Sequence, residues 1–470
     1  MSENIKCDVV VLGGGPGGYT AAFRAADLGL SVCLVEGSER LGGVCLNVGC
    51  IPSKTLLHGA AVIEEAAESS HFGITFEPPK IDIDAFRSHK ESVIKQLTDG
   101  LDKLCTARKI TRLTGQGSFK DGSTLAVKGP EGEQEVAFTD AIIATGSHPF
   151  RLPGVPEDPR IWDSSDALEL STVPKRFLII GGGIIGLEMA QIYSGLGSEI
   201  TIVEMLDQII PPADKDLVQP LLQKIKKKYT IFTKTKVTEI TAEASGIQVR
   251  FEGAKAPENA EYDAVLVAVG RRPNTEHFGR ENIGLDLDEH GFIEVNKQQQ
   301  TAVANIYGIG DVVGEPMLAH KATHEGKVAA EVIAGHKSAF EPMTIPSVAY
   351  TNPEIAWMGL TEKEAKAKNI AYDKGKFLWG ASGRALSSGA GAGATKALFD
   401  KETGRILGAG ICGMNAGELI HEAVLALEMG ADAEDISKTV HAHPTLAETF
   451  AFAAEIVDGS ITDGLPPKKK

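Results

Sequence analysis

Two stretches far apart in the chain follow one pattern, and this repeat limits the possible folds more than any other feature. Residues 9–36 read "VVVLGGGPGGYTAAFRAADLGLSVCLVE", and residues 177–204 read "FLIIGGGIIGLEMAQIYSGLGSEITIVE". Each stretch is an apolar, β-branched run, a glycine-rich turn, a helix-forming segment and a second β-branched run that ends in glutamate. This order predicts a βαβ unit of the mononucleotide-binding kind. The chain is therefore expected to contain two such units.

The glycines of each turn have separate expected roles. The first permits a tight turn, the second lets the backbone approach a pyrophosphate, and the third lets the helix pack close to the strand. Glu36 and Glu204 end the second strands, where a carboxylate can accept hydrogen bonds from an adenosine ribose. A single glycine turn can simply connect a strand to a helix, but two copies with matched acids favour two dinucleotide sites. The glycines concerned are Gly13, Gly15 and Gly18 in the first unit and Gly181, Gly183 and Gly186 in the second.

The residues around Glu204 indicate which nicotinamide nucleotide the second unit binds. The local sequence "VEMLDQ" contains no arginine or lysine to hold a 2′-phosphate, and a carboxylate repels one. This favours NAD over NADP. Because two dinucleotides in one chain suggest a flavin beside a nicotinamide, FAD and NAD are the expected cofactors.

Proline- and glycine-rich stretches at 149–160 and 270–279 resemble joints on either side of the second βαβ unit. After residue 345 or so the pattern changes to short alternating runs and then to the helical run "AGELIHEAVLALEMG". We therefore expect an α/β protein with two Rossmann-like domains and an α+β C-terminal dimerisation domain. The predicted ranges are 1–150 for the FAD domain, 151–278 for the NAD domain, 279–345 for a central domain completing the FAD site and 346–470 for the interface domain.

Composition excludes some classes of partner. The chain is 43% hydrophobic and 23% charged, with a net charge of -16, so nucleic acid is a poor partner. The basic stretch "KIKKK" (224–228) is expected to be a solvated helix face, because no aromatic residue is interleaved with it. The start of the sequence lacks a leader pattern, and nowhere do eighteen apolar residues run together. These features predict a cytoplasmic protein with no membrane span.

A pair of cysteines in "GGVCLNVGCIPSK" (42–54) is the main chemical signal. A zinc site would need two more ligands at similar spacing, and a structural disulfide is rare in a reducing compartment. Two unconnected thiols are possible, but the surrounding glycines and Pro52 predict a tight, shaped turn. A redox-active disulfide between Cys45 and Cys50 is favoured, because a helix starting near Pro52 and the charge of Lys54 would both stabilise a thiolate.

Other polar residues have two open interpretations each. Asp311, in "GIGDVVGEPMLAHKA", suits either a flavin ribityl hydroxyl or a helix cap. His443 in "HAHPTLAE" suits proton transfer if Glu448 orients it, but it could also simply pack at the final helix. His320 and His324 are spaced like metal ligands but lack a third ligand, so no metal site is predicted.

Several motifs together carry a resemblance to a known family. "GGVCLNVGCIPSK", "IIATGS", "GRRPN", "YGIGD" and "HAHPTLAE", with the two glycine turns, closely resemble the pyridine nucleotide-disulfide oxidoreductases. The resemblance extends over essentially the whole chain. It implies an enzyme that oxidises a dihydrolipoyl dithiol through a redox-active disulfide and FAD to reduce NAD+.

The resemblance also implies roles for individual residues. Cys45 would be the interchange thiol and Cys50 the thiol next to the flavin, while His443 would be the acid/base oriented by Glu448. Lys54 would lie near the flavin and pair with Glu188. The implied FAD residues are Gly13, Gly15, Gly18, Glu36, Lys54, Gly117, Thr145, Gly146, Asp311, Met317, Leu318, Ala319 and His320. The implied NAD residues are Gly181, Gly183, Gly186, Glu188, Glu204, Val237 and Gly270.

The implied partners are a second copy of the chain and a lipoyl protein. His443 and Glu448 of one chain would complete the cysteine site of the other. The lipoyl domains would belong to 2-oxo acid dehydrogenase complexes or to the glycine cleavage system. The alternatives are relatives that reduce glutathione disulfide, mercuric ion, peroxide or coenzyme A disulfide, or a flavin-bearing scaffold without turnover. Glu204, the paired cysteines and the absence of any cysteine beyond Cys412 argue against the other reductases, and the intact cysteines with His443 argue against a scaffold.

Overall fold

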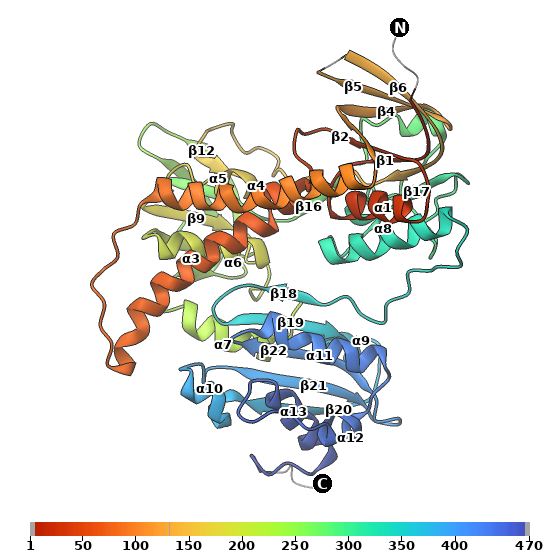
Figure 1. Cartoon of the computed structure of the whole chain (residues 1–470). Helices are drawn as coiled ribbons and strands as arrows, with labels where there is room; N and C mark the ends of the chain where they lie inside the picture. Colours follow the sequence, from red (N-terminus) through yellow and green to blue (C-terminus); the bar gives the residue numbers. More distant parts are fainter. Residues whose placement is uncertain (1–4, 131, 466–470) are drawn as a thin grey trace.

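The computed structural model describes residues 5–130 and 132–465. Its three main sheets divide the chain into a first unit, a second unit and a C-terminal unit (Figure 1). The C-terminal sheet lies below the other two in this view. Within the described residues, no helix is long and apolar enough to cross a membrane.

The first unit is built around a sheet of order β3-β2-β1-β6-β5-β4, with β17 added beside β6. Val9, Val10 and Val11 are fully buried, as expected for a central parallel strand covered on both faces. Helices α1 (Pro16–Asp27) and α8 (Ala319–Ile333) pack on each other against it. The strands are β1 (Ile5–Leu12), β2 (Val32–Glu36), β3 (Thr111–Thr114), β4 (Gln116–Asp121), β5 (Thr124–Gly129), β6 (Gly132–Ile143) and β17 (Ile306–Gly308). Residues beyond the second unit therefore return to complete the first sheet.

The second unit repeats this arrangement with a parallel sheet of order β11-β10-β9-β15-β8. Its elements are β8 (Ile161–Trp162), α5 (Ser164–Glu169), β9 (Arg176–Ile180), α6 (Ile184–Gly195), β10 (Glu199–Val203), α7 (Lys215–Ile225), β11 (Thr230–Phe232) and β15 (Ala264–Val267). An antiparallel sheet of β12 (Lys236–Ala242), β13 (Ile247–Glu252) and β14 (Asn259–Tyr262) was not predicted. The chain enters and leaves through paired strands β7 (Ser147–Pro149) and β16 (Arg271–Pro273), at the two predicted joints.

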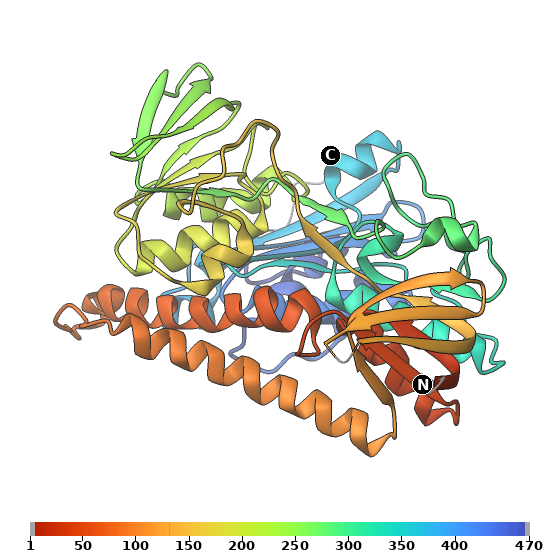
Figure 2. The ribbon, with the colours of Figure 1, turned by 90° about the horizontal axis from the view of Figure 1, so that it is seen from above.

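Three helices between β2 and β3 link the first unit to the second by packing against it. They are α2 (Gly43–Val48), α3 (Cys50–Glu68) and α4 (Ile83–Ala107), and the two long ones run along one side of the molecule (Figure 2). Helix α3 packs closely on α6, since a Cβ at Gly195 would lie 2.9 Å from the Ala60 Cβ. The structure corrects the prediction that the two cysteines lie in one tight turn, because Cys45 and Cys50 lie in two successive helices. The second helix starts at Cys50 and has Pro52 in its first turn, which agrees with the helix predicted to start near Pro52.

The C-terminal unit has an antiparallel sheet of order β18-β19-β22-β21-β20. Helix α11 packs against β19 and β22, and α13 packs against β20 and β21. Leu425 on α11 and Met429 directly after it are 63% and 77% exposed, so the C-terminal end of this helix has apolar side chains that face away from the chain's own core. The elements are β18 (Ser347–Ala349), β19 (Glu354–Gly359), α9 (Glu362–Ala367), β20 (Tyr372–Leu378), α10 (Gly383–Ser387), β21 (Ala394–Asp400), β22 (Ile406–Gly413), α11 (Ala416–Glu428), α12 (Ala433–Lys438) and α13 (Glu448–Asp458).

The basic stretch at 224–228 is ion-paired as well as solvated. Lys224 and Lys228 both lie beside Glu64 and Glu68 on α3. These contacts tie the end of α7 to α3. The stretch therefore has acidic partners within the chain.

Candidate active site

A cleft of about 2810 Å³ brings together residues of the first and second units. Both glycine turns line it, and so do Cys45 and Cys50. Of the residues proposed from the sequence to hold FAD or NAD, every one lines this cleft except Gly186. The cleft also reaches the C-terminal unit at Tyr350, His421 and Val424.

The glycine turns of the two units have the same geometry. Gly13 and Gly181 have φ of +108° and +113°, and a Cβ on them would lie 2.2 Å and 2.3 Å from the carbonyl oxygen of the residue that follows the neighbouring strand, β6 or β15. A Cβ at Gly186 would lie 2.1 Å from the Gly181 oxygen, so this glycine serves helix–strand packing and not the cleft. Around Gly183, by contrast, a Cβ would meet nothing within 4 Å. The turns thus leave room at the helix N-termini, which fits a pyrophosphate in each unit.

Glu36 and Glu204 are held in place by backbone donors. Glu36 accepts from the N–H groups of Gly14 at 2.7 Å and Ser38 at 2.9 Å. Glu204 accepts from the N–H groups of Gly182 and Leu206, each at 2.8 Å. Both carboxylates line the cleft beside their turns, so each remains available to a ribose. The chain's residues therefore fit two dinucleotides.

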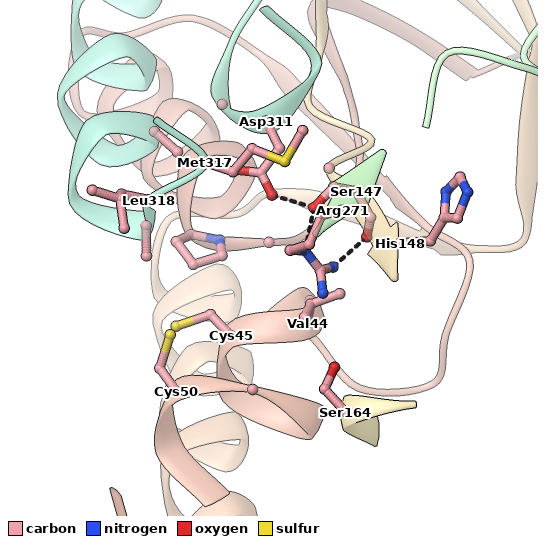
Figure 3. A pocket seen from close by; sticks show the side chains of 18 of the residues that line it. Val44, Cys45, Cys50, Ser147, His148, Ser164, Arg271, Asp311, Met317 and Leu318 are labelled. Atoms are coloured by element: carbon pink, nitrogen blue, oxygen red, sulfur yellow. Dashed lines mark hydrogen bonds between the residues drawn. The ribbon is translucent and has the colours of Figure 1, made fainter. Parts of the chain in front are cut away.

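The two cysteine side chains point toward each other across the break between α2 and α3 (Figure 3). Both are free thiols in this structure. A hydrogen bond from Cys45 and the nearby charge of Lys54 lower the pKa of Cys50 to about 7. The same hydrogen bond and burial raise the pKa of Cys45. When the pair is reduced, Cys50 is therefore the one that carries the thiolate at neutral pH.

The predicted Lys54–Glu188 pair is present. The Lys54 Nζ lies 3.0 Å and 2.9 Å from the two carboxylate oxygens, and Glu188 is only 3% exposed. The carboxylate also accepts from the Ser53 hydroxyl at 2.7 Å and from the Tyr350 N–H at 3.3 Å. Ser53 and Tyr350 were not predicted from the sequence, where nothing links them to Glu188.

Asp311 lies in a short 3-10 helix, Gly310–Val313, and does not cap α8, whose N-cap is Leu318. The helix-cap interpretation is therefore wrong for α8. Asp311 accepts from the Ser147 hydroxyl, which in turn accepts from the Arg271 Nε at 2.8 Å (Figure 3). Burial lowers the pKa of Arg271. Ser147 and Arg271 were missed as site residues because their spacing to Asp311 along the chain is large.

His443 and Glu448 form a pair at a distance from this cleft. The His443 Nδ1 lies 2.8 Å from Glu448, whose other oxygen accepts from the Thr445 N–H at 2.7 Å. The imidazole is 80% exposed, and neither residue lines the cleft. A single chain therefore does not bring His443 to Cys45. Nearby, the His441 Nε2 lies 2.7 Å from Glu422, and this contact raises the pKa of His441.

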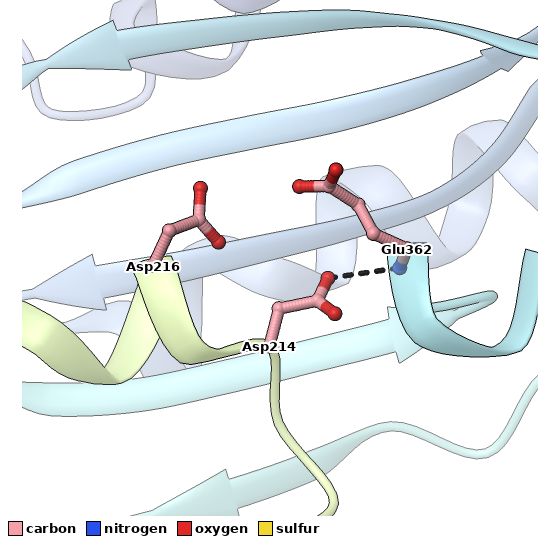
Figure 4. Close-up of side chains that lie close together, drawn as sticks. All are labelled: Asp214, Asp216 and Glu362. Atoms are coloured by element: carbon pink, nitrogen blue, oxygen red, sulfur yellow. Dashed lines mark hydrogen bonds between the residues drawn. The ribbon is translucent and has the colours of Figure 1, made fainter. Parts of the chain in front are cut away.

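One acidic cluster has the spacing of a metal site. Asp214, Asp216 and Glu362 approach one another between the second and C-terminal units (Figure 4). However, the Lys396 Nζ lies 2.6 Å, 2.6 Å and 3.0 Å from these three carboxylates. This lysine already supplies the cation between them. His320 also has a different partner, since its Nε2 lies 2.9 Å from the Pro346 oxygen.

Comparison with known proteins identifies the family. Residues 7–326 match the model of pyridine nucleotide-disulphide oxidoreductases, and residues 345–454 match the dimerisation domain of the same family. The chain belongs to this family. The match confirms the resemblance and the predicted fold class. It also confirms FAD with NAD(H) as the cofactors, since these are what this family uses.

Curated relatives align with the chain from end to end. The dihydrolipoyl dehydrogenase of Vibrio cholerae is 57% identical, over 100% of this chain and 99% of its own length. Those of Haemophilus influenzae and Geobacillus stearothermophilus are 55% and 43% identical, covering 98% and 97% of their own lengths and 100% and 97% of this chain.

Solved structures agree on the fold. The HOCl-induced flavoprotein disulfide reductase RclA of Escherichia coli is 26% identical with a TM-score of 0.85, over 96% of this chain and 100% of its own. LpdA of Mycobacterium tuberculosis, at 24% identity and a TM-score of 0.89 over 96% of this chain and 99% of its own, supports the fold alone.

Proposed function

We propose that this chain oxidises dihydrolipoyl groups to the lipoyl disulfide and reduces NAD+ to NADH. The observation that carries the proposal is that Cys45 and Cys50 face each other in the same cleft as two dinucleotide-binding turns. The end-to-end similarity to dihydrolipoyl dehydrogenases supports the choice of dithiol.

The cysteine pair exchanges two electrons with the substrate. A substrate thiolate attacks Cys45 of the Cys45–Cys50 disulfide, and Cys50 leaves as a thiolate, which its low pKa favours. The second substrate thiolate then attacks the mixed disulfide, releasing the lipoyl disulfide and leaving both cysteines reduced. A base must take the substrate protons, and the imidazole of His443, oriented by Glu448, has suitable chemistry. Bound FAD supplies the route by which the electron pair reaches NAD+.

Residues of the first unit would hold FAD and residues of the second NAD. Gly13, Gly15 and Glu36 are suited to the adenosine diphosphate part of FAD, and Asp311 is suited to the ribityl chain of FAD. In the second unit, Glu204 is suited to the adenosine ribose of NAD and disfavours a 2′-phosphate. The other residues named from the sequence for each cofactor line the same cleft, with the exception of Gly186.

We infer that the working form is a two-fold homodimer in which His443 and Glu448 of the partner subunit complete the cysteine site. The exposure of the imidazole, its absence from the chain's own cleft and the dimerisation domain support this. The exposed apolar side chains Leu425 and Met429 offer a surface for the second copy. The expected partners are lipoyl domains of 2-oxo acid dehydrogenase complexes or of glycine cleavage.

A paired assay tests the function. The purified protein is supplied with dihydrolipoamide and NAD+ in one reaction and with glutathione disulfide and NADPH in the other. We expect turnover in the first reaction only, and its loss in Cys45→Ser and Cys50→Ser with the flavin still bound. Turnover with glutathione disulfide alone would overturn the substrate assignment, and full activity of either cysteine variant would remove the disulfide from the reaction.

A further inference from the structure

Glu188 joins the three units of the molecule at one buried carboxylate. The residue lies on α6 of the second unit and accepts from Ser53 and Lys54 of α3. Its third partner is the backbone N–H of Tyr350, in the segment between β18 and β19 of the C-terminal unit. The packing of the C-terminal sheet against the other two units is therefore fixed close to the cysteine pair.

Tyr350 contacts both members of the ion pair. Its backbone bonds Glu188, and the Lys54 Nζ lies 4.5 Å from the centroid of its ring. That distance is within the range of a cation–π interaction. The ring is supported from behind by α11, where a Cβ at Gly417 would lie 3.5 Å from the Tyr350 Cε1. With 37% of its surface exposed, the tyrosine forms part of the cleft wall.

The position of the Lys54 ammonium affects the ionisation of Cys50 in the cysteine pair. Lys54 stands one helical turn beyond Cys50, and its charge is one of the causes that lower the pKa of that thiol. The titratable and charged groups acting on Cys50 are Cys45 from α2, Lys54 from α3, Glu188 from α6 and Arg271 from β16. Glu188 raises the pKa of the same thiol, so the Lys54 ammonium, which lies 2.9 Å from Glu188, offsets the effect of this carboxylate on the thiolate.

We propose that Tyr350 is a positioning residue for Lys54, and that its ring face and Glu188 together hold the ammonium beside Cys50. The C-terminal unit thereby contributes to the redox centre of its own chain. The inference rests on the proposed function only in taking Cys50 as a reacting thiol. It assigns no contact between Tyr350 and the substrate.

A series of variants with the same side-chain shape tests the proposal. Tyr350 is replaced by phenylalanine and by mono-, di- and trifluorinated phenylalanine, in which fluorine withdraws electron density from the ring face. The background is Cys45→Ser, so that Cys50 carries no disulfide. The ionisation of Cys50 is followed across a range of pH by its ultraviolet thiolate absorbance. This is the difference between each variant and the same variant that also carries Cys50→Ser. Flavin content and dimer mass are measured for every variant.

The proposal predicts that Tyr350→Phe behaves like the wild-type residue, because it keeps the ring face. With increasing fluorination the midpoint of the Cys50 titration should rise in steps, by about half a pH unit in total, which is a roughly threefold decrease in the acid dissociation constant of the thiol. The midpoint should rise because a fluorinated ring holds the Lys54 ammonium less tightly, and a less tightly held ammonium stabilises the Cys50 thiolate less. A mere packing role predicts no trend, since fluorine hardly changes the shape.

Equal midpoints throughout the series would overturn the proposal. So would a full shift already present in Tyr350→Phe, because that would assign the effect to the hydroxyl group. Since the monofluoro and difluoro variants alone define a slope, the test stands even where the trifluoro protein does not fold. Wild-type turnover with dihydrolipoamide is measured separately. If the wild-type protein does not turn over dihydrolipoamide but the Cys50 midpoint still rises with fluorination, the proposed substrate is refuted and the role of Tyr350 is supported.

Discussion

At the scale of single residues, Glu204 is expected to decide between the two nicotinamide nucleotides. Glu204→Ala should lower the ratio of kcat/KM for NAD+ to that for NADP+ by about tenfold, because it removes a ribose acceptor and a charge that repels the 2′-phosphate. Steady-state kinetics with both nucleotides measure this ratio. The matched control is Glu36→Ala, the corresponding change in the first unit, which should loosen FAD and leave the ratio unchanged.

Equal use of NAD+ and NADP+ by the wild-type protein would contradict this role of Glu204. Lys236, which the local sequence around Glu204 does not contain, also lines the cleft. The double variant Glu204→Ala with Lys236→Met therefore separates two effects on the 2′-phosphate of NADP+, which are the loss of repulsion by Glu204 and an attraction by Lys236.

At the scale of secondary-structure elements, the Lys396 cluster is expected to hold the second and C-terminal units together. Lys396 on β21 is 3% exposed and joins Asp214 and Asp216, at the start of α7, to Glu362 at the start of α9. Lys396→Met should destabilise the protein by about 3 kcal/mol, because it leaves the buried Asp214 carboxylate without its cation, while Asp216 keeps Lys376 and Glu362 keeps Lys374. The thermal unfolding temperature with flavin bound measures the change.

The neighbouring Lys374 provides a matched control. It also pairs with Glu362, but it is 37% exposed, so Lys374→Met should cost under about 1 kcal/mol. In Lys396→Met the freed carboxylates become oxygen ligands for a divalent cation, and added Ca²⁺ should raise the unfolding temperature of that variant alone. Equal unfolding temperatures for wild type and Lys396→Met would show that the cluster does not stabilise the contact.

Elements with one strong periodic pattern were predictable from the sequence. The two βαβ units have apolar runs and glycine turns whose meaning is local, so β1, α1, β9 and α6 appear where the pattern predicts them. The small β12–β14 sheet was not foreseen, although β13 alternates apolar and polar residues, because its strands lie beyond the βαβ motif. The break at Gly49, with φ of -143° and ψ of -113°, separates α2 from α3 where a single turn was expected.

The candidate site was predictable where a residue's role depends on its sequence neighbours. Cys45, Cys50, Gly13 and Gly181 are of this kind. Tyr350 and Ser147 are different, because their partners are more than a hundred residues away along the chain. Only the packing of the three units brings them to Glu188 and Asp311. The same reason explains why the exposed position of His443 could not be read from its motif.

At the scale of the whole molecule, the dimer is expected to assemble each site from both chains. Cys45→Ser and His443→Gln chains, each inactive alone, should complement when they are unfolded together and refolded as a mixture. About half of the dimers should then be mixed, each with one intact site, so roughly a quarter of wild-type activity should return. Mixed dimers that carry flavin and stay inactive would place the complete site within one chain.

The most direct test of the central claim follows the sulfur atoms themselves. Oxidised protein is mixed with dihydrolipoamide without oxygen or NAD+, quenched in acid, denatured and alkylated, and its cysteines are then assigned by mass spectrometry. We predict that Cys45 and Cys50 become alkylated together, with one lipoamide formed per pair, while the other four cysteines keep their redox state. Adding NAD+ before the quench should restore the Cys45–Cys50 disulfide with the formation of NADH. Formation of lipoamide and NADH while Cys45 and Cys50 never form a disulfide would contradict the account.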